Sequence, residues 1–323
     1  MTEKEPSRDE LEAAHCWETD DHVPKRPEMT AYRRRMRLHQ ARWRESHGHP
    51  IGSQPLVPHA GKSSRPVGSR LPVDYARATG ATFLSHAAHA AATARLSPSA
   101  KEPHQSLDAQ RTWAELLWPT AFCFNLFGAL ATNLELAGRA VRTWWPDLPG
   151  TVAAVRFEHS PGRLDPAYIG NLCAFGVAFV LDLGDGTRGI VGVKAAYADW
   201  NKRQPPKPER LARYVEVSER SGAFGPGWLD AVNGTELIHI WLEHQLLHSM
   251  LQHPDGGWRS GRYVVIHPAG NTDFADACAS YRGLLVDDST FASTTVEELL
   301  GGGIFPEPMV AAFRERYLPE PDT

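Results

Sequence analysis

The spacing of apolar positions predicts helices in the first half of the chain. Apolar residues recur at intervals of three and four before Pro146, which indicates one amphipathic helix that ends there. These residues are Leu126, Leu130, Leu134, Ala137, Val141 and Trp144. Helices are also predicted in the alanine-rich run from Phe83 to Leu96 and in LDAQRTWAELLW, which is broken at Pro119. Residues 48–75, rich in Gly, Pro and Ser, are expected to form a long loop.

After Pro146 the pattern becomes that of β-strands. Three apolar segments are β-rich, TVAAVRFEHS, CAFGVAFVLDL and RGIVGVKAAY, and Gly184-Asp185-Gly186 joins the last two as a hairpin. A loop, a helix, a short strand and a helix are then expected at NKRQPPKPER, Thr235–Gln252, Arg262–His267 and Asn271–Leu285. The order helix, three strands, helix, strand, helix predicts an α/β layered core behind a helical N-terminal region.

The composition narrows the class of protein without identifying a function. With 323 residues, 42% of them hydrophobic, the chain can bury a substantial core, and its net charge of −4 excludes a polycation that coats nucleic acid over its whole surface. The four cysteines form no CxxC pair, which disfavours a disulfide scaffold or zinc ribbon and fits a cytoplasmic protein. The acidic N-terminus predicts no secretory signal. The uncharged stretch Leu116–Leu134 contains Pro119 and two asparagines, so we expect a buried helix there instead of a membrane span.

The first residues carry strongly separated charges. Residues 1–21 hold eight acids and two bases, whereas residues 25–44 hold eight bases and one acid. An acidic tail followed by a basic arm can fold back on itself, or the tail can compete with a polyanion for the arm. Phosphate contact would use Arg33, Arg34, Arg35 and Arg37. The alternative is a solvated helix, TAYRRRMRLHQARWRE, whose contacts with the body of the protein are Tyr32, Met36, Leu38 and Trp43.

Familiar nucleotide-binding and hydrolase motifs are missing or incomplete. Gly61-Lys62-Ser63 resembles the end of a P-loop, but the position that requires the first glycine of that motif is Leu56. His244 and His248 lie one helical turn apart, as paired metal ligands can, yet no third ligand is apparent in the sequence. We therefore expect these histidines at a helix surface or interface, and the single cysteines as packing residues.

Several short motifs carry a resemblance to one family. They run from about Tyr32 to Arg316-Tyr317-Leu318, and VRFEHSPGR together with FCFNLFG is the most specific combination. The others are WRESHGHPIG, WWPDLP, AFGVAFV, IWLEHQLL and YVVIHPAGN. In these motifs the chain resembles a bacterial group of predicted restriction endonucleases within the PD-(D/E)XK nuclease superfamily. The resemblance implies an α/β fold with an αβββαβ, restriction-endonuclease-like core and a helical N-terminal extension.

The catalytic motif of that superfamily is altered in this chain. The second core strand of the superfamily carries an aspartate and the third carries Glu-x-Lys; the two carboxylates hold Mg²⁺, and the lysine positions the nucleophile or stabilises developing charge. Here the aligned positions are Gly176, Lys194 and Ala196. Moving the register by two residues keeps a lysine in Gly192-Val193-Lys194 but supplies no acid. The family triad sums to −1, whereas Gly176, Lys194 and Ala196 sum to +1, so the site is expected to repel Mg²⁺ and attract phosphate.

Neighbouring polar residues are expected to line the same cleft. Glu158 and Arg163 match family positions, and the resemblance makes Glu158 and Lys194 the candidate relocated catalytic residues, with Glu158 as the candidate metal ligand and Asp182 or Asp199 as a displaced second ligand. Arg163 and Lys194 are also candidate phosphate contacts. The alternative for Glu158 is an ion pair with Arg163 or Arg156 that holds the loop. The topology can bring further polar groups near this cleft, namely Tyr197, Asp199, Glu243 and His244.

These patterns divide the chain into a flexible acidic tail (1–30), a basic arm with a Pro/Gly-rich loop and N-terminal helices (31–110), and a nuclease-like α/β core (111–323). The chain keeps the motifs of the family, but all three catalytic positions are replaced. This combination predicts a catalytically degenerate nuclease-fold protein. Such a protein would bind nucleic acid, with DNA as the first expectation, or a nucleic-acid-processing partner, as in bacterial defence, and would need no cofactor. The alternatives are an active Mg²⁺-dependent endonuclease with relocated catalytic residues, and a regulatory or structural protein–protein subunit.

Overall fold

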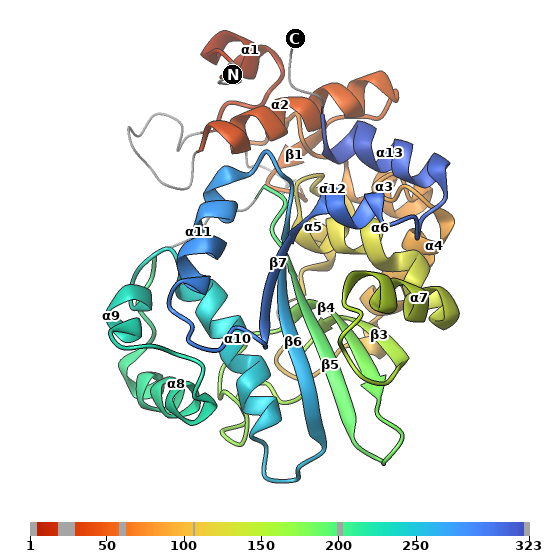
Figure 1. Cartoon of the computed structure of the whole chain (residues 1–323). Coiled ribbons are helices and arrows are strands. Elements are labelled where there is room, and N and C mark those ends of the chain that lie inside the picture. The colour runs from red at the N-terminus through yellow and green to blue at the C-terminus, as the bar shows by residue number, and fades with distance from the viewer. Residues whose placement is uncertain (1–4, 19–29, 58–62, 106, 199–202, 320–323) are drawn as a thin grey trace.

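A mixed β-sheet organises the chain. The computed structural model describes residues 5–18, 30–57, 63–105, 107–198 and 203–319, and within them the main sheet has five strands (Figure 1). The strands are β3 (Thr151–His159), β4 (Phe175–Asp182), β5 (Arg188–Ala195), β6 (Trp258–His267) and β7 (Phe291–Thr295). Strands β3, β4 and β5 are antiparallel neighbours, whereas β5, β6 and β7 run parallel and are joined by helical crossovers. The three-strand prediction and the later strand are confirmed; β6 begins earlier than predicted, and β7 is an addition to the predicted elements.

Helices cover both faces of this sheet (Figure 1), which is why its central strands are apolar on both sides. One face is covered by α4 (His86–Leu96), α6 (Pro119–Thr132), α7 (Leu134–Trp144), α12 (Val296–Gly301) and α13 (Glu307–Tyr317). The other is covered by α8 (Pro208–Ser221), α9 (Trp228–Val232), α10 (Ile238–Leu251) and α11 (Thr272–Arg282). In β4, Val177 and Phe179 pack in the first core while Ala178 and Val180 pack in the second.

The helix predicted to end before Pro146 is two helices. Asn133 ends α6 and begins α7, and its side-chain Oδ1 accepts a hydrogen bond from the backbone N–H of Leu136 at 2.9 Å. This cap interrupts the helix without changing the apolar spacing, so the spacing alone could not reveal it. The helix α8 begins at Pro208, inside the segment predicted as loop, because proline is favoured at the first position of a helix.

Short elements of the N-terminal region complete the structure. The helix α1 (Arg8–Ala13) lies against α2 (Ala31–Ser46), which in turn contacts α13 (Figure 1). The predicted long loop contains the antiparallel strands β1 (Gly52–Gln54) and β2 (Arg65–Val67) and the start of α3 (Val73–Thr79). A 3₁₀ turn at Pro98–Ala100 and α5 (Ala109–Ala114) follow. The segment expected as a flexible acidic tail therefore includes an ordered helix.

The uncharged stretch from Leu116 to Leu134 contains all of α6, and the side chains of this helix are largely buried, as expected. In the described part of the chain, no helix is both long and apolar enough to cross a membrane. All four cysteines carry free thiols. The proposed three-part division of the chain stays a prediction.

Candidate functional site

The first three strands of the sheet bring Glu158, Gly176 and Lys194 into one row. Continuing the β3–β4 register places Glu158 opposite Gly176, and continuing the β4–β5 register places Gly176 opposite Lys194. Neighbouring strands lie about 4.8 Å apart, so the backbones of Glu158 and Lys194 are about 10 Å apart. The row lies at the edge of the sheet where β3 and β5 end and β4 begins. The two candidate relocated residues are therefore brought to the same region.

Two of the three positions aligned with the catalytic motif are packing sites: Gly176, aligned with the aspartate, and Ala196, aligned with the lysine. A Cβ at Gly176 would lie 3.1 Å from Sγ of Cys123 on α6, a tight contact that requires a neighbouring atom to move slightly. Ala196 is fully buried in the core beneath α10. The tight contact at Gly176 and the full burial of Ala196 give a physical reason for the small residues found there.

Lys194 is held by an acid from the opposite layer. Its Nζ donates to Oε1 of Glu243 on α10 at 2.8 Å, and Oε2 of the same carboxylate accepts from the hydroxyl of Tyr263 on β6 at 3.1 Å. The Lys194 and Glu243 side chains are 20% and 15% exposed. Burial, and next the Glu243 carboxylate, raise the pKa of Tyr263 well above its usual value, so its hydroxyl stays a donor. The charge of +1 expected for Gly176, Lys194 and Ala196 is wrong for the site as a whole. Glu243, which is not one of the aligned strand positions, adds one negative charge and makes the sum zero.

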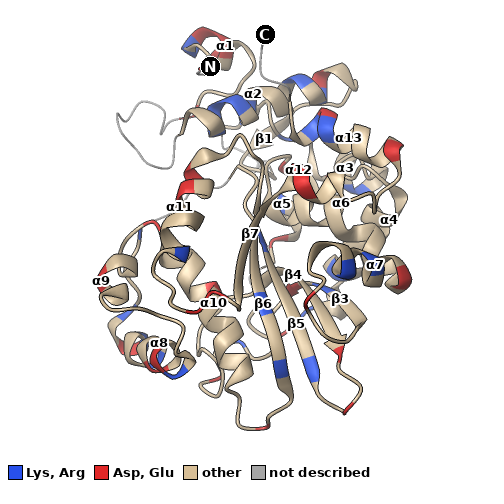
Figure 2. Ribbon diagram, viewed as in Figure 1, with Lys and Arg blue, Asp and Glu red and all other residues tan. Residues whose placement is uncertain are grey.

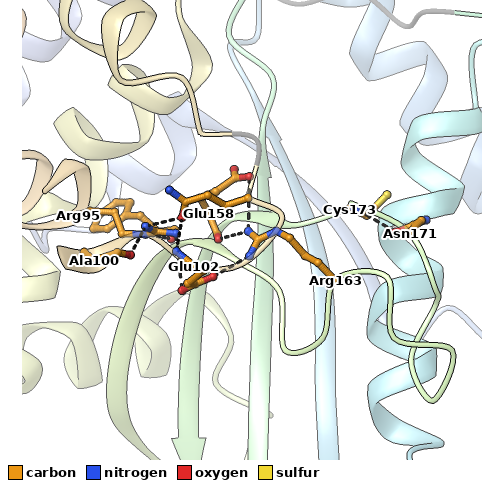
Figure 3. A network of polar contacts seen from close by, with 9 residues as sticks. Arg95, Ala100, Glu102, Glu158, Arg163, Asn171 and Cys173 are labelled. Carbon is orange, nitrogen blue, oxygen red and sulfur yellow. Dashed lines mark hydrogen bonds and ion pairs between the residues drawn. The ribbon is translucent and has the colours of Figure 1, made fainter. Parts of the chain in front are cut away.

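A second ion-pair network fixes the end of β3 (Figure 3). Arg163, with only 3% of its side chain exposed, donates from Nη1 to Oε2 of Glu102 at 2.6 Å and from Nη2 to the backbone oxygen of Glu158 at 2.7 Å. Oε1 of Glu158 lies 3.6 Å from the same Nη2. Arg95 contributes by donating to the backbone oxygen of Phe157 at 2.9 Å. The ion pair that was the alternative interpretation of Glu158 is therefore present.

This network also explains the backbone of Glu158. Its φ of +50° lies in the left-handed region, which is unfavourable for a residue with a side chain. Arg163 binds both the carbonyl and the carboxylate of Glu158, so it stabilises that conformation. A phosphate contact by Arg163 would require this network to open, because its guanidinium lies inside the network and not on the surface.

Cys173 lies just before β4, close in sequence to Gly176 of the row described above. Burial raises the pKa of its thiol to about 12; the Glu243 and Glu158 carboxylates raise it further and the Lys194 ammonium lowers it. Charged groups of both networks therefore change the pKa of the thiol, which is protonated and unreactive near neutral pH. Its backbone N–H is fixed by Oδ1 of Asn171 at 2.8 Å (Figure 3). We call Glu102, Glu158, Arg163, Lys194 and Glu243 the sheet-end cluster.

The side chains at the sheet-end cluster do not fit a magnesium site as they are arranged. Both oxygens of Glu243 are engaged, by Lys194 and Tyr263, and one oxygen of Glu158 faces Arg163. Among the described residues, no group of three or more His, Cys, Asp or Glu side chains is placed to hold a metal ion. Asp182 lies at the hairpin end of β4, where its Oδ1 accepts from the N–H of Gly184, and Asp199 lies outside the described residues.

His244 and His248 correct the expectation of a surface or interface role. Both are buried, because α10 is covered by the sheet on one side and by α8 and α11 on the other. Nδ1 of His244 is 2.8 Å from the hydroxyl of Tyr281, and its Nε2 is 2.9 Å from Oγ1 of Thr290. Burial lowers the pKa of His244 well below its usual value and that of His248 to about 4, so both are neutral core residues. Tyr197 is also buried, in the other core, where Gln40 of α2 donates to its hydroxyl at 3.0 Å.

The four candidate arginines of α2 are bound to neighbouring groups in three different ways. Arg33 donates to the backbone oxygen of Ala198 at 2.6 Å, just beyond β5, and the guanidinium of Arg35 lies 5.6 Å from the ring centre of Tyr32. Arg34 forms an ion pair with Glu5, and Arg37, which is only 1% exposed, forms one with Glu18 at 3.2 Å. The predicted body contacts Tyr32, Met36, Leu38 and Trp43 are all buried. A phosphate contact by Arg37 would require Glu18 to move away.

Comparison with known proteins gives one match. A family model described as the PD-(D/E)XK nuclease superfamily matches residues 27–319. Neither a curated protein nor a solved structure matches the chain.

Proposed function

The chain belongs to the PD-(D/E)XK nuclease superfamily, and we propose that it is a catalytically degenerate member that binds nucleic acid, DNA in the first place, without cleaving it. The observation that carries the proposal is the state of Glu243, the acid in contact with Lys194, which stands at the position of the motif glutamate in one register and of the motif lysine in the other. One of its oxygens is bound by Lys194 and the other by Tyr263. The positions aligned with the catalytic aspartate and glutamate hold Gly176, which is packed against α6, and Lys194, and the position aligned with the lysine holds Ala196, in the α10 core.

Binding in this proposal relies on phosphate contacts. The net charge of −4 leaves the protein as a whole without attraction for a polyanion, so the contacts need a local basic surface. The arginines of α2, Arg33, Arg34, Arg35 and Arg37, form the densest run of bases in the sequence. Guanidinium groups bind phosphate oxygens through charge-assisted hydrogen bonds that carry no base sequence information. The proposed protein therefore recognises the backbone of DNA, in the cytoplasm and as part of a defence or nucleic-acid-processing function.

A salt titration of DNA binding tests this proposal. Fluorescence anisotropy with a short labelled duplex should give an affinity that falls steeply with ionic strength. An interface of about four phosphate contacts predicts a loss of about 100-fold between about 50 and about 200 mM salt. An affinity that stays flat over this range would contradict the proposal. Absence of DNA and RNA binding, together with co-purification of a stoichiometric protein partner, would replace it with a protein–protein function.

A second candidate function is an active Mg²⁺-dependent endonuclease that uses Glu158 and Lys194. The observation in its favour is that the strand register brings Glu158 to the same end of the sheet as Lys194, which is bound by Glu243. These three charges sum to −1, the same value as the aspartate, glutamate and lysine of the superfamily. Glu158 would be a metal ligand in such an enzyme, and the Lys194–Glu243 pair would have to open. Cleavage by the wild-type protein that is lost in Glu158→Ala would establish this function, whereas cleavage retained by that variant would exclude it.

A further inference from the structure

Residues 5–18, which we call the acidic segment, lie on α2. The segment contains α1, whose Leu11 is fully buried and packs with Cys16 against Leu38 and Ala41 of α2. The backbone N–H of Gly68, next to β2, donates to the backbone oxygen of His15 at 2.9 Å. The segment is therefore fixed at a defined place by a small apolar contact and by backbone hydrogen bonding, although its sequence is rich in acids.

Three acids of this segment each bind one arginine of α2. Glu5 pairs with Arg34, Glu18 lies 3.2 Å from Arg37, and Glu10 lies 3.6 Å from Arg42. The arginines are spaced by three and five residues, so with Leu38 and Ala41 they belong to one side of the helix. Figure 2 shows acidic positions on α1 and basic positions on α2, with the two helices next to each other. The fold-back that was one of the two sequence-based expectations is present.

Carboxylate and phosphate oxygens bind guanidinium groups in the same way, through charge-assisted hydrogen bonds. We propose that the side of α2 that bears Arg34, Arg37 and Arg42 is the surface that binds backbone phosphates of DNA, and that the acidic segment occupies it in competition with them. The inference rests on the proposed function and adds the location and the regulation of binding. The Glu5, Glu10 and Glu18 side chains are 50%, 46% and 34% exposed. Ion pairs with such exposed partners are weak and screened by salt, so a polyanion can displace them.

The acidic segment has few buried contacts with α2, as expected of a segment that DNA can displace. The helix α1 has six residues and one fully buried apolar side chain, Leu11. Elements with few buried contacts open at a small fraction of the global stability. Arg37 is 1% exposed with the segment in place and pairs with Glu18 of that segment, so displacement makes a further guanidinium accessible to phosphate.

The first test compares two triple variants of the full chain in the anisotropy assay. Glu5→Gln, Glu10→Gln and Glu18→Gln together remove the carboxylates that bind α2. The control carries Glu135→Gln, Glu209→Gln and Glu219→Gln, which remove the same charge from exposed positions on α7 and α8. The first variant should bind a DNA duplex about tenfold more tightly than the control, and the slope of log affinity against log salt should be steeper by up to about 2.7. Affinities of the two variants within twofold of each other would overturn the inference.

A second measurement uses the wild-type protein and does not depend on any substitution. Addition of the DNA duplex should speed up hydrogen exchange of the backbone amides of Leu11, Ala14 and Cys16, which donate to oxygens within the segment. Unchanged or slower exchange at these amides would overturn the competition, because DNA would then bind with the segment in place. If neither the wild type nor the variants bind DNA at low salt, the proposed function fails as well. If all of them bind equally, only the inference about the acidic segment fails.

Discussion

Charged side chains at the sheet-end cluster and on the outer side of α2 are held in different ways. At the sheet end, Lys194 and Arg163 are 20% and 3% exposed and are bound by acids from other layers of the fold. On α2, Arg34 and Arg42 are bound by acids of the short segment that lies on them; the side chains of Arg34 and Glu5 are 20% and 50% exposed, and those of Arg42 and Glu10 are 60% and 46% exposed. Both regions are charged, but only one can be uncovered without opening the core.

Buried and exposed ion pairs differ in what they contribute to the protein. In a buried pair, removal of one partner leaves a charge without solvent or counter-charge, so the pair is needed for stability. In an exposed pair, water replaces the lost partner, so the pair contributes little to stability and can instead control access to a surface. The sheet-end cluster is in the first case, which is why we place DNA binding on α2 and not on Lys194 alone.

The largest expected effect is a loss of folding stability at acid pH, which buried histidines cause and exposed histidines do not. Burial lowers the pKa of His159 to about 4 and that of His248 to about 4, from an ordinary value of 6.5. Between these values the unfolded chain binds more protons than the folded protein. Stability should therefore be complete above pH 6.5 and be lost as the pH falls from 6.5 toward 4, by up to about 3 kcal/mol for each histidine. Urea unfolding at a series of pH values measures this loss.

Variants of buried and exposed histidines test which side chains cause this pH dependence. His159→Gln combined with His248→Asn should make the curve less steep, with buried His244 as a remaining contributor, whereas His86→Gln on α4 should leave the curve unchanged, because His86 is exposed. A double variant as sensitive to acid as the wild type would show that other groups cause the loss.

The next largest effect concerns the Lys194–Glu243 pair. Glu243→Leu leaves the largely buried ammonium of Lys194 without its carboxylate, and should lower the free energy of unfolding by about 3 kcal/mol. Combining it with Lys194→Met removes both charges and should restore most of the loss. Chemical denaturation of the single and double variants measures the difference. A double variant no more stable than Glu243→Leu would mean that packing, and not charge, accounts for the effect.

A smaller loss is expected at Arg163. Arg163→Met removes the donors to Glu102 and to the backbone of Glu158, and should reduce stability by about 2 kcal/mol, since hydrogen bonds to charged groups contribute about 1.5 to 3 kcal/mol. Arg163→Lys should restore only part of it, because one ammonium cannot reproduce a planar guanidinium that binds two groups. A methionine variant as stable as the wild type would show that the left-handed Glu158 does not depend on this network.

The smallest effect is expected on α2. Arg34→Met and Arg42→Met should each change the free energy of unfolding by no more than about 1 kcal/mol, because their ion pairs are at the surface. Thermal or urea unfolding can measure both variants beside Arg163→Met. A loss of more than about 2 kcal/mol in either variant would place the surface pairs in the same class as the buried ones and remove the contrast between the two regions.

The sequence predicts the frame of the fold better than its site. Local patterns were sufficient for β3, β4 and β5, because their apolar runs are long and a glycine-rich hairpin joins the last two. They were insufficient for the break at Asn133, since a polar cap can sit between two helices without disturbing the apolar spacing. The short strands β1 and β2 lie in a segment whose Gly and Pro content is typical of loops.

The site depends on contacts between residues that are far apart in sequence. Glu243 reaches Lys194 across 49 positions, because the crossover from β5 to β6 carries α10 over the sheet, and no local spacing indicates that pairing. Arg37 likewise pairs with Glu18 of the acidic segment, 19 positions earlier in the chain. The family resemblance did place Glu158 and Lys194 in one region, where the strand register brings them, and of the two partners considered for Glu158, Arg163 and Arg156, the structure pairs it with Arg163.

The most direct test of the central claim is one native agarose gel with supercoiled plasmid. The wild-type protein is titrated into the plasmid with Mg²⁺ or Mn²⁺ at low salt, and half of each sample is deproteinised before loading. The account predicts a retarded plasmid in the untreated lanes and intact supercoiled plasmid in the deproteinised lanes. Nicked or linear plasmid that appears with the wild type and disappears with Glu158→Ala would contradict it and establish a working, relocated active site.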